Sequence, residues 1–352
     1  MNELVEKYQH AIKYLFIPYL VLLFLLFYPL EYYVQSPGGL SEVEKLVNIE
    51  YQEEKETKGS ISTTFVMGIP SPTIFQFLVG YFNPYSDLSV LPASYQQYTP
   101  TEVTRISNLD KVISLHNAVI VAYQARMQDD PAIILSSEVK TVVFGKSSTL
   151  SHYDEIAFGD EFVSLLGDND TLVKSISEIG GATTNGNEYA FTFRNKAGEL
   201  YTVNLLKNLD TGLFGITFRT YEEVDPALSY PIFTINDSNI GGPSGGLLQT
   251  LAIYDMLTET DITHGKKIAG TGTINQDGSV GYIGGVKQKI ITAYENNVDV
   301  FFIPYLDDVS YDNYLEAVNV CKAYNIPYED WLIPIETFQN ALDYLNLMGG
   351  AE

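Results

Sequence analysis

The feature that most constrains this chain is residues 14–30, seventeen consecutive residues without a charge. Tyr32 and Tyr33 border the run at its far end. About twenty helical residues cover the roughly 30 Å hydrocarbon layer of a bilayer, and tyrosines favour the edges of that layer. The sequence therefore predicts a transmembrane helix within residues 1–33.

A cleaved signal peptide is the alternative interpretation of this segment. Residues 29–31 read Pro-Leu-Glu, whereas a signal-peptidase site requires small residues, so an uncleaved anchor is favoured. Lys7 and Lys13 precede the run and only Lys45 follows it closely, which places the N-terminus in the cytoplasm. We therefore expect a single-pass cell-membrane protein whose remaining chain is extracellular.

The amino-acid composition limits the domain organisation and the kinds of molecule that this protein can bind. The 352 residues are 45% hydrophobic, enough for an anchor and two globular units. Cys321 is the only cysteine, so an internal disulfide is excluded. The net charge of −24 argues against nucleic acid and anionic lipid as partners and is compatible with a cationic peptide.

Motifs for metals, dinucleotides and nucleotides are missing from the sequence. It contains no HExxH, no paired CxxC and no GxGxxG after a clear strand. Residues 144–147 end like a P-loop, but Lys140 stands where the first glycine of that motif is required. We therefore expect no metal, no cofactor and no bound nucleotide.

Residues 241–246 read GGPSGG and combine features of a nucleophile site. Residues 230–235 predict a short strand before them, and apolar residues recur at helical spacing after them, with Gly242 as the expected cap and Pro243 as the first helical residue. Free amides at such a helix start can stabilise a developing oxyanion. The sequence therefore predicts Ser244 as a nucleophile supported by Gly242 and Gly245.

A serine hydroxyl needs a base, and an amine serves only when it is uncharged. Lys287 lies 287 − 244 = 43 positions after Ser244, behind the apolar, glycine-rich residues 280–286. Burial there would have to lower the lysine pKa by roughly 3 units. Lys289 is about 200° further round the same predicted helix, so both lysines cannot face the serine. The sequence predicts Lys287 as the base.

The turn also fits the G-x-S-x-G elbow of α/β-hydrolases, whose triad runs serine, acid, histidine. His264 is the only histidine after Ser244 and follows it by twenty residues. That spacing leaves no room for the strands and helices that normally separate the two residues, so a histidine base is not expected.

From about residue 240 to residue 304 the chain resembles the proteolytic domain of Lon-like proteases. The GGPS turn, the IYDMLT helix end, the IAGTGTI strand and the GGVKQK helix come in the family order. The resemblance implies a Ser244/Lys287 dyad in which Thr271 hydrogen-bonds the lysine. It also implies a domain over residues 208–352 with the ribosomal protein S5 domain 2-like fold, acting without ATP. One departure is Gly245, where many relatives have alanine.

Residues 131–207 resemble a PDZ domain. Residues 156–162 match the apolar-x-x-Gly-Asp-x-apolar turn of that family, residues 172–179 predict a helix, and residues 189–194 and 200–205 predict closing strands. No carboxylate-binding loop of the Gly-Leu-Gly-Phe kind is visible, so two roles stay open. The unit captures peptides by strand addition, or it is a spacer that positions the protease.

Residues 34–130 are expected to form an extracytoplasmic region that packs with the protease domain, with a strand over residues 59–67 and a helix over residues 101–127. Two further helices, over residues 311–324 and 336–347, and a strand over residues 298–304 are expected near the C-terminus. The predicted fold class is α+β, with a transmembrane helix, a PDZ-like domain and a Lon-type proteolytic domain.

The whole chain is similar to the membrane-anchored, PDZ-containing Ser/Lys proteases of Gram-positive bacteria that process peptide pheromones. That resemblance implies an ATP-independent serine endopeptidase that cleaves extracytoplasmic peptides or proteins, among them secreted signalling peptides. The alternative is a membrane-tethered PDZ adaptor that binds peptides without cutting them. Retention of both Ser244 and Lys287 favours the enzyme.

Overall fold

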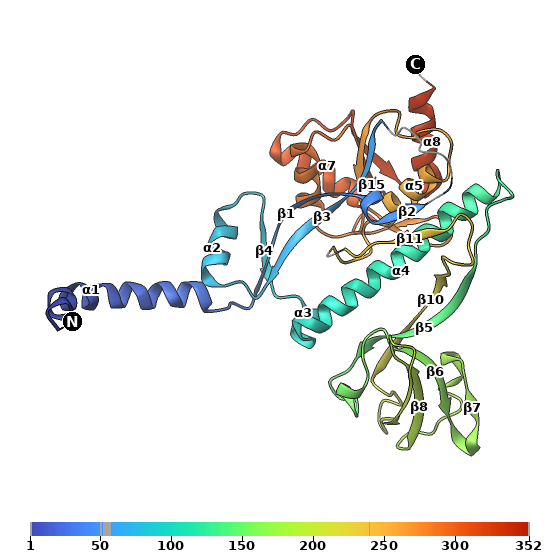
Figure 1. Ribbon diagram of the computed structural model, residues 1–352, viewed down its shortest axis with the longest axis horizontal. Coiled ribbons are helices and arrows are strands. Elements are labelled where there is room, and N and C mark those ends of the chain that lie inside the picture. The colour runs from blue at the N-terminus through green and yellow to red at the C-terminus, as the bar shows by residue number, and fades with distance from the viewer. Residues whose placement is uncertain (1, 50, 52–57, 239, 351–352) are drawn as a thin grey trace.

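The structure is a computed structural model that describes residues 2–49, 51, 58–238 and 240–350. Three parts are visible in Figure 1: a projecting helix, a body built on a six-stranded sheet, and a smaller β-structure below it. Helix α4 (Pro100–Met127) runs from the smaller sheet into the body. The site described below lies in the body.

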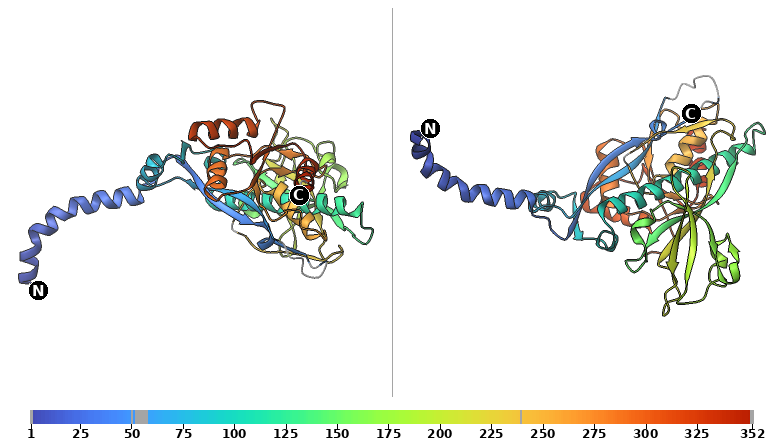
Figure 2. Two further views of the ribbon diagram at one scale, coloured as in Figure 1. Left: turned by 90° about the horizontal axis from the view of Figure 1, so that it is seen from above. Right: turned by 60° about the horizontal axis from the view of Figure 1, so that its bottom comes forward.

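Helix α1 (Asn2–Phe27) projects from the rest of the molecule in all three views (Figures 1 and 2). Its C-terminal end lies against α2 (Ile74–Phe82), where Tyr28 O accepts a hydrogen bond from Ile74 N at 3.2 Å. The uncharged run at residues 14–30 predicts a transmembrane anchor here. Within the described part of the chain, however, no helix has both the length and the apolar character needed to span a bilayer.

The main sheet joins strands from both ends of the chain. Its order is β16 (Leu332–Ile335), β15 (Val300–Pro304), β12 (Lys267–Gly270), β3 (Ser60–Pro70), β1 (Tyr32–Glu42) and β4 (Asp87–Val90). The first four strands run parallel to one another, and β1 pairs antiparallel with both β3 and β4. The fold is therefore a mixed α/β structure.

Helices cover both faces of this sheet, because its central strands are apolar on both sides. Ile268 and Phe302 point into a core with α4, α5 and α8, whereas Ala269 and Phe301 point into a second core with α6 and α7. The helices are α5 (Gly246–Met256), α6 (Val286–Glu295), α7 (Asn313–Tyr324) and α8 (Phe338–Gly349). This alternation follows the two-residue period of a strand.

The smaller sheet has the order β10 (Ile216–Val224), β5 (Ser137–Lys146), β6 (Glu161–Leu166), β8 (Glu188–Arg194) and β9 (Leu200–Leu206), with β7 (Leu172–Val173) paired to β6. Phe162, Phe191 and Phe193 fill its core. The strands expected over residues 189–194 and 200–205 are confirmed. The resemblance of this unit to a PDZ domain stays a prediction.

The helix expected over residues 172–179 is wrong. The segment contains β7 and a single 3-10 turn, Ile176–Glu178. Leu172 is 59% exposed and Val173 is 2% exposed, which is the alternation of a strand. Ser175 and Ser177 hydrogen-bond each other at 2.7 Å, as short polar side chains do when they compete with helical hydrogen bonding.

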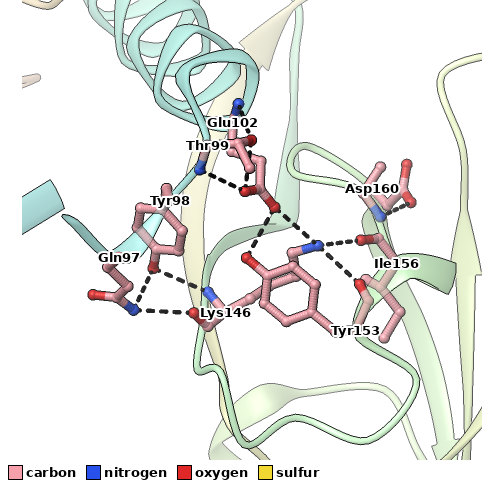
Figure 3. A network of polar contacts seen from close by, with 9 residues as sticks. Gln97, Tyr98, Thr99, Glu102, Lys146, Tyr153, Ile156 and Asp160 are labelled. Carbon is pink, nitrogen blue, oxygen red and sulfur yellow. Dashed lines mark hydrogen bonds and ion pairs between the residues drawn. The ribbon is translucent and has the colours of Figure 1, made fainter. Parts of the chain in front are cut away.

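A buried lysine fastens the start of α4 to the smaller sheet (Figure 3). Lys146 Nζ donates hydrogen bonds to the carbonyl oxygens of Tyr153 and Ile156 at 2.9 and 2.8 Å. It also lies 3.7 Å from the carboxylate of Glu102 in the first turn of α4. Burial lowers the pKa of Lys146, although the Glu102 carboxylate opposes this. The lysine of the P-loop-like segment is thus occupied by the protein's own oxygens.

Most other expected elements are confirmed with shifts of a few residues. The helices over 101–127, 311–324 and 336–347 correspond to α4, α7 and α8, and the strands over 59–67 and 298–304 to β3 and β15. The strand expected over 230–235 is confined to β11 (Phe233–Ile235), which pairs with β2 (Val47–Ile49). Short elements complete the chain: α3 (Ala93–Gln97), β13 (Thr273–Ile274) and β14 (Val280–Gly281).

Candidate active site

Ser244 lies in a turn immediately before α5, not inside the helix. Gly242 has φ of +87°, a conformation that residues with a Cβ adopt only with strain, so it cannot be an ordinary helix cap. Gly246 N donates to Pro243 O at 3.2 Å, which closes the turn, and α5 begins at Gly246 with Gly245 as its cap. The expectation that Pro243 opens the helix is therefore wrong by three residues.

Helix α4 holds this loop along its length. The contacts are hydrogen bonds from Gly242 N to Ser107 O at 3.0 Å, from Lys111 Nζ to Ser238 O at 2.6 Å, and from Ser114 Oγ to Pro243 O at 3.0 Å. No local pattern in the sequence predicts this arrangement, because α4 and the loop are more than one hundred residues apart.

These contacts change the expected oxyanion donors. The Gly242 amide already donates to Ser107 O, so it is not available to a substrate oxygen. No described residue accepts a hydrogen bond from the amides of Ser244 or Gly245. Both amides precede α5, whose dipole favours negative charge at that end. The geometry thus retains Gly245 as a candidate donor and removes Gly242.

Lys289 is the lysine that the structure brings to the serine. Its side chain is 3% exposed, and burial lowers its pKa to about 7. Lys289 Nζ donates to Thr271 Oγ1 at 2.8 Å, and Thr271 Oγ1 donates its own proton to Ser244 O at 3.0 Å. Among the described residues, the Lys289 amine makes only this one hydrogen bond, and it makes it as a donor. The lone pair of the neutral amine is therefore free to accept a proton.

Lys287 faces the opposite way, which corrects the expected base. Its Nζ lies 2.8 Å from Asp87 Oδ1 and donates to Ser86 O at 3.1 Å. Partial burial lowers the pKa of Lys287, but the hydrogen bonds to Asp87 and Tyr324 outweigh this effect and the pKa is raised. A cation held by a carboxylate cannot take the proton of a serine at neutral pH.

Lys287 was chosen over Lys289 because the buried face of α6 was assigned to the wrong side of the helix. The two lysines do point apart, as expected, but the buried face of α6 is set by Val286, Ile290 and Ala293. Lys289 follows Val286 by three residues and lies on that face. This apolar spacing is the signal in the sequence that could have identified Lys289.

Ser244 and Lys289 line one cavity of about 650 Å³ in the body. Lys287 does not line it. The wall carries the apolar side chains of Phe65, Met67 and Ile240, and the polar side chains of Thr63 and Gln249. The cavity therefore combines a serine, a lysine of lowered pKa and room for a substrate side chain.

Part of the chain is similar to a known protein family. Residues 215–319 match the Lon protease (S16) C-terminal proteolytic domain. The matched segment contains the serine, the threonine and the buried lysine described above, and the match supports a serine peptidase.

Curated relatives cover the same region. The chain is 31% identical over 104 residues to the Lon protease of Mesomycoplasma hyopneumoniae, which is 30% of this chain and 11% of that protein. It is 38% identical over 101 residues to the Lon protease of Malacoplasma penetrans, 27% of this chain and 12% of that protein. The Lon protease of Mycoplasma pneumoniae is 43% identical over 76 residues, 20% of this chain and 9% of that protein. The chain thus spans only about a tenth of these relatives' length.

Proposed function

We propose that this chain is a serine endopeptidase with Ser244 as the nucleophile and Lys289 as the general base, acting on peptides or unfolded proteins without nucleotide. The observation that carries the proposal is the placement of a buried lysine, with its pKa lowered to about 7, in the cavity that Ser244 lines. A base whose pKa lies near the working pH transfers protons most effectively. The match to the Lon proteolytic domain supports the same chemistry.

The proposed reaction follows from the contacts. Ser244 Oγ attacks the carbonyl carbon of the scissile bond while neutral Lys289 takes its proton. The amides of Ser244 and Gly245 hold the negative oxygen of the tetrahedral intermediate. Lys289 then returns the proton to the leaving amine, and a water activated by the same lysine hydrolyses the acyl-enzyme. Thr271 keeps the lysine in place throughout.

The test is cleavage by the purified full-length chain of an unfolded protein and of a mixed peptide library, without nucleotide and with chelator present. Mass spectrometry of the products should show new termini that are absent from a parallel reaction with Ser244→Ala. Cleavage that persists in the Ser244→Ala protein, or that requires added ATP, would contradict the proposal.

The hydroxyl of Thr271 provides a prediction of intermediate size. Thr271→Val keeps the shape of the side chain but removes the atom that accepts from Lys289 and donates to Ser244 O. We expect kcat/KM to fall by about 10- to 100-fold, mostly in kcat, because a misplaced base slows proton transfer and not binding. Thr271→Ser retains the hydroxyl and serves as the control. Equal activity of the valine and serine variants would show that the hydroxyl has no role.

The finer part of the proposal concerns the substrate and the compartment. The resemblance to pheromone-processing proteases supports a secreted signalling peptide as the substrate and a site of action outside the cytoplasm, and the net charge of −24 is compatible with a cationic peptide. Peptides in the medium of cells carrying the wild-type chain or Ser244→Ala would be compared by mass spectrometry. A peptide whose mature form disappears in the variant identifies the substrate, and identical peptide profiles would refute this part.

A further inference from the structure

A polar side chain without a partner lies beside the proposed nucleophile. Gln249 is on the first turns of α5 and is 6% exposed, yet its Oε1 has no hydrogen-bond partner among the described residues. No described residue accepts a hydrogen bond from its Nε2. The carboxamide therefore makes no hydrogen bond with the described part of the chain.

The rest of α5 shows that this state is unusual. Residues 246–253 are all buried, and Thr250, the other polar side chain among them, donates its hydroxyl to Gly246 O at 2.9 Å. An unsatisfied buried polar group costs folding free energy. A methionine of the same shape would avoid this cost, so a packing role does not account for a glutamine at this position.

Gln249 also lies against the residue that follows the nucleophile. A Cβ built on Gly245 would lie 3.2 Å from Gln249 Nε2 and 3.0 Å from Thr63 Cγ2. The carboxamide is therefore beside the Ser244–Gly245 peptide, and it lines the same cavity as Ser244 and Lys289. A substrate side chain that enters the cavity would meet it there.

We propose that Gln249 is a specificity-determining residue, which selects substrates whose side chain in this cavity carries a carboxamide. The carbonyl oxygen of a substrate glutamine or asparagine would accept a hydrogen bond from Gln249 Nε2, which donates to no described residue and, unlike Oε1, is not fully buried. The apolar wall of Phe65 and Met67 packs on the methylene groups of either substrate type. The carboxamide therefore decides between a glutamine and a methionine of the same shape, because the methionine leaves Gln249 unpaired.

The inference rests on the proposed function for its cleavage readout but is tested by binding as well. Labelled decapeptides in which glutamine replaces methionine at one position at a time would be bound to the full-length Ser244→Ala protein, and their cleavage by the intact enzyme would be followed in parallel. We expect one position at which glutamine is preferred by about tenfold in Kd and in kcat/KM, as one net hydrogen bond predicts. Gln249→Met should abolish that preference, because the variant side chain makes no hydrogen bond to either peptide.

Gln288 provides the matched control. Its Oε1 is likewise buried without a partner, but its Nε2 donates to Asp87 Oδ2 at 2.7 Å and the residue does not line the cavity. Gln288→Met should therefore keep the glutamine preference. Equal Kd values for all peptide pairs, or a preference that survives Gln249→Met, would overturn the inference. A preference in Kd without any cleavage would instead refute the proposed function and leave this inference standing.

Discussion

Replacing Lys289 by Met is expected to lower kcat/KM by at least about 10³-fold, whereas the same replacement of Lys287 should leave it within about threefold of wild type. Lys289 is the lysine with a lowered pKa in the cavity, and Lys287 is paired with Asp87 outside it. Methionine keeps the length of the side chain and removes the proton acceptor. The measurement is steady-state cleavage of one peptide by the three proteins.

Two further variants sharpen this comparison. Lys289→Arg keeps a long cationic side chain that cannot deprotonate, so it should be as inactive as Lys289→Met. Ser244→Ala combined with Lys289→Met should be no slower than either single variant, because residues that act as one unit are non-additive. Activity lost on replacing Lys287 and retained on replacing Lys289 would reverse the assignment.

The second prediction with a large expected effect concerns the pH dependence of kcat/KM. In the free enzyme kcat/KM should rise with pH through a midpoint near the Lys289 pKa of about 7, since only the neutral amine can take the serine proton. Between pH 8 and pH 5 this corresponds to a fall of about 90-fold. A histidine base would give a similar curve, so His264→Ala and His116→Ala are measured alongside and should retain the wild-type profile. Loss of activity in either variant would contradict a lysine base.

The same pKa predicts a stability effect with a defined sign. In the unfolded chain Lys289 keeps its ordinary pKa of 10.5, whereas in the folded chain the pKa is about 7. Between these two values the unfolded state binds more protons, so this residue makes the free energy of unfolding increase with pH. Below pH 7 Lys289 is protonated in both states, and it then lowers the free energy of unfolding by its full amount. Lys289→Met should flatten this part of the curve and should be at least as stable as wild type at pH 6, which denaturant unfolding measures and which also shows that the variant is folded.

The local patterns in the sequence predicted much of the fold but not the assembly of the site. Apolar spacing located α4, α7 and α8, and alternation located β8 and β9, because each pattern reflects one buried face. The lysine was misassigned because Lys287 was chosen for the apolar, glycine-rich residues before it, whereas the buried face of α6 is set by Val286, Ile290 and Ala293 and includes Lys289. The role of Gly242 was missed because its amide is satisfied by Ser107 in a distant helix, and the sequence carries no record of such a pairing.

The segment that matches the Lon proteolytic domain does not coincide with the folded unit that holds the candidate site. The strands β5 and β10 enter and leave the smaller sheet as neighbours, with Ser137 opposite Val224, and Ile134 pairs with Tyr230 just outside them. The smaller sheet is thus an insertion into one discontinuous domain, and its two ends meet at a single point, where an inserted unit disturbs the host least. The matched residues 215–319 start one residue before the last strand of this insertion, so they include only that strand of the smaller sheet, and they stop before β16. A fragment cut at those limits would lack β3 and α4, and with them the neighbour of β12 and the support of the serine loop. The smallest intact catalytic unit is therefore made of two separated stretches of chain, one before the insertion and one after it.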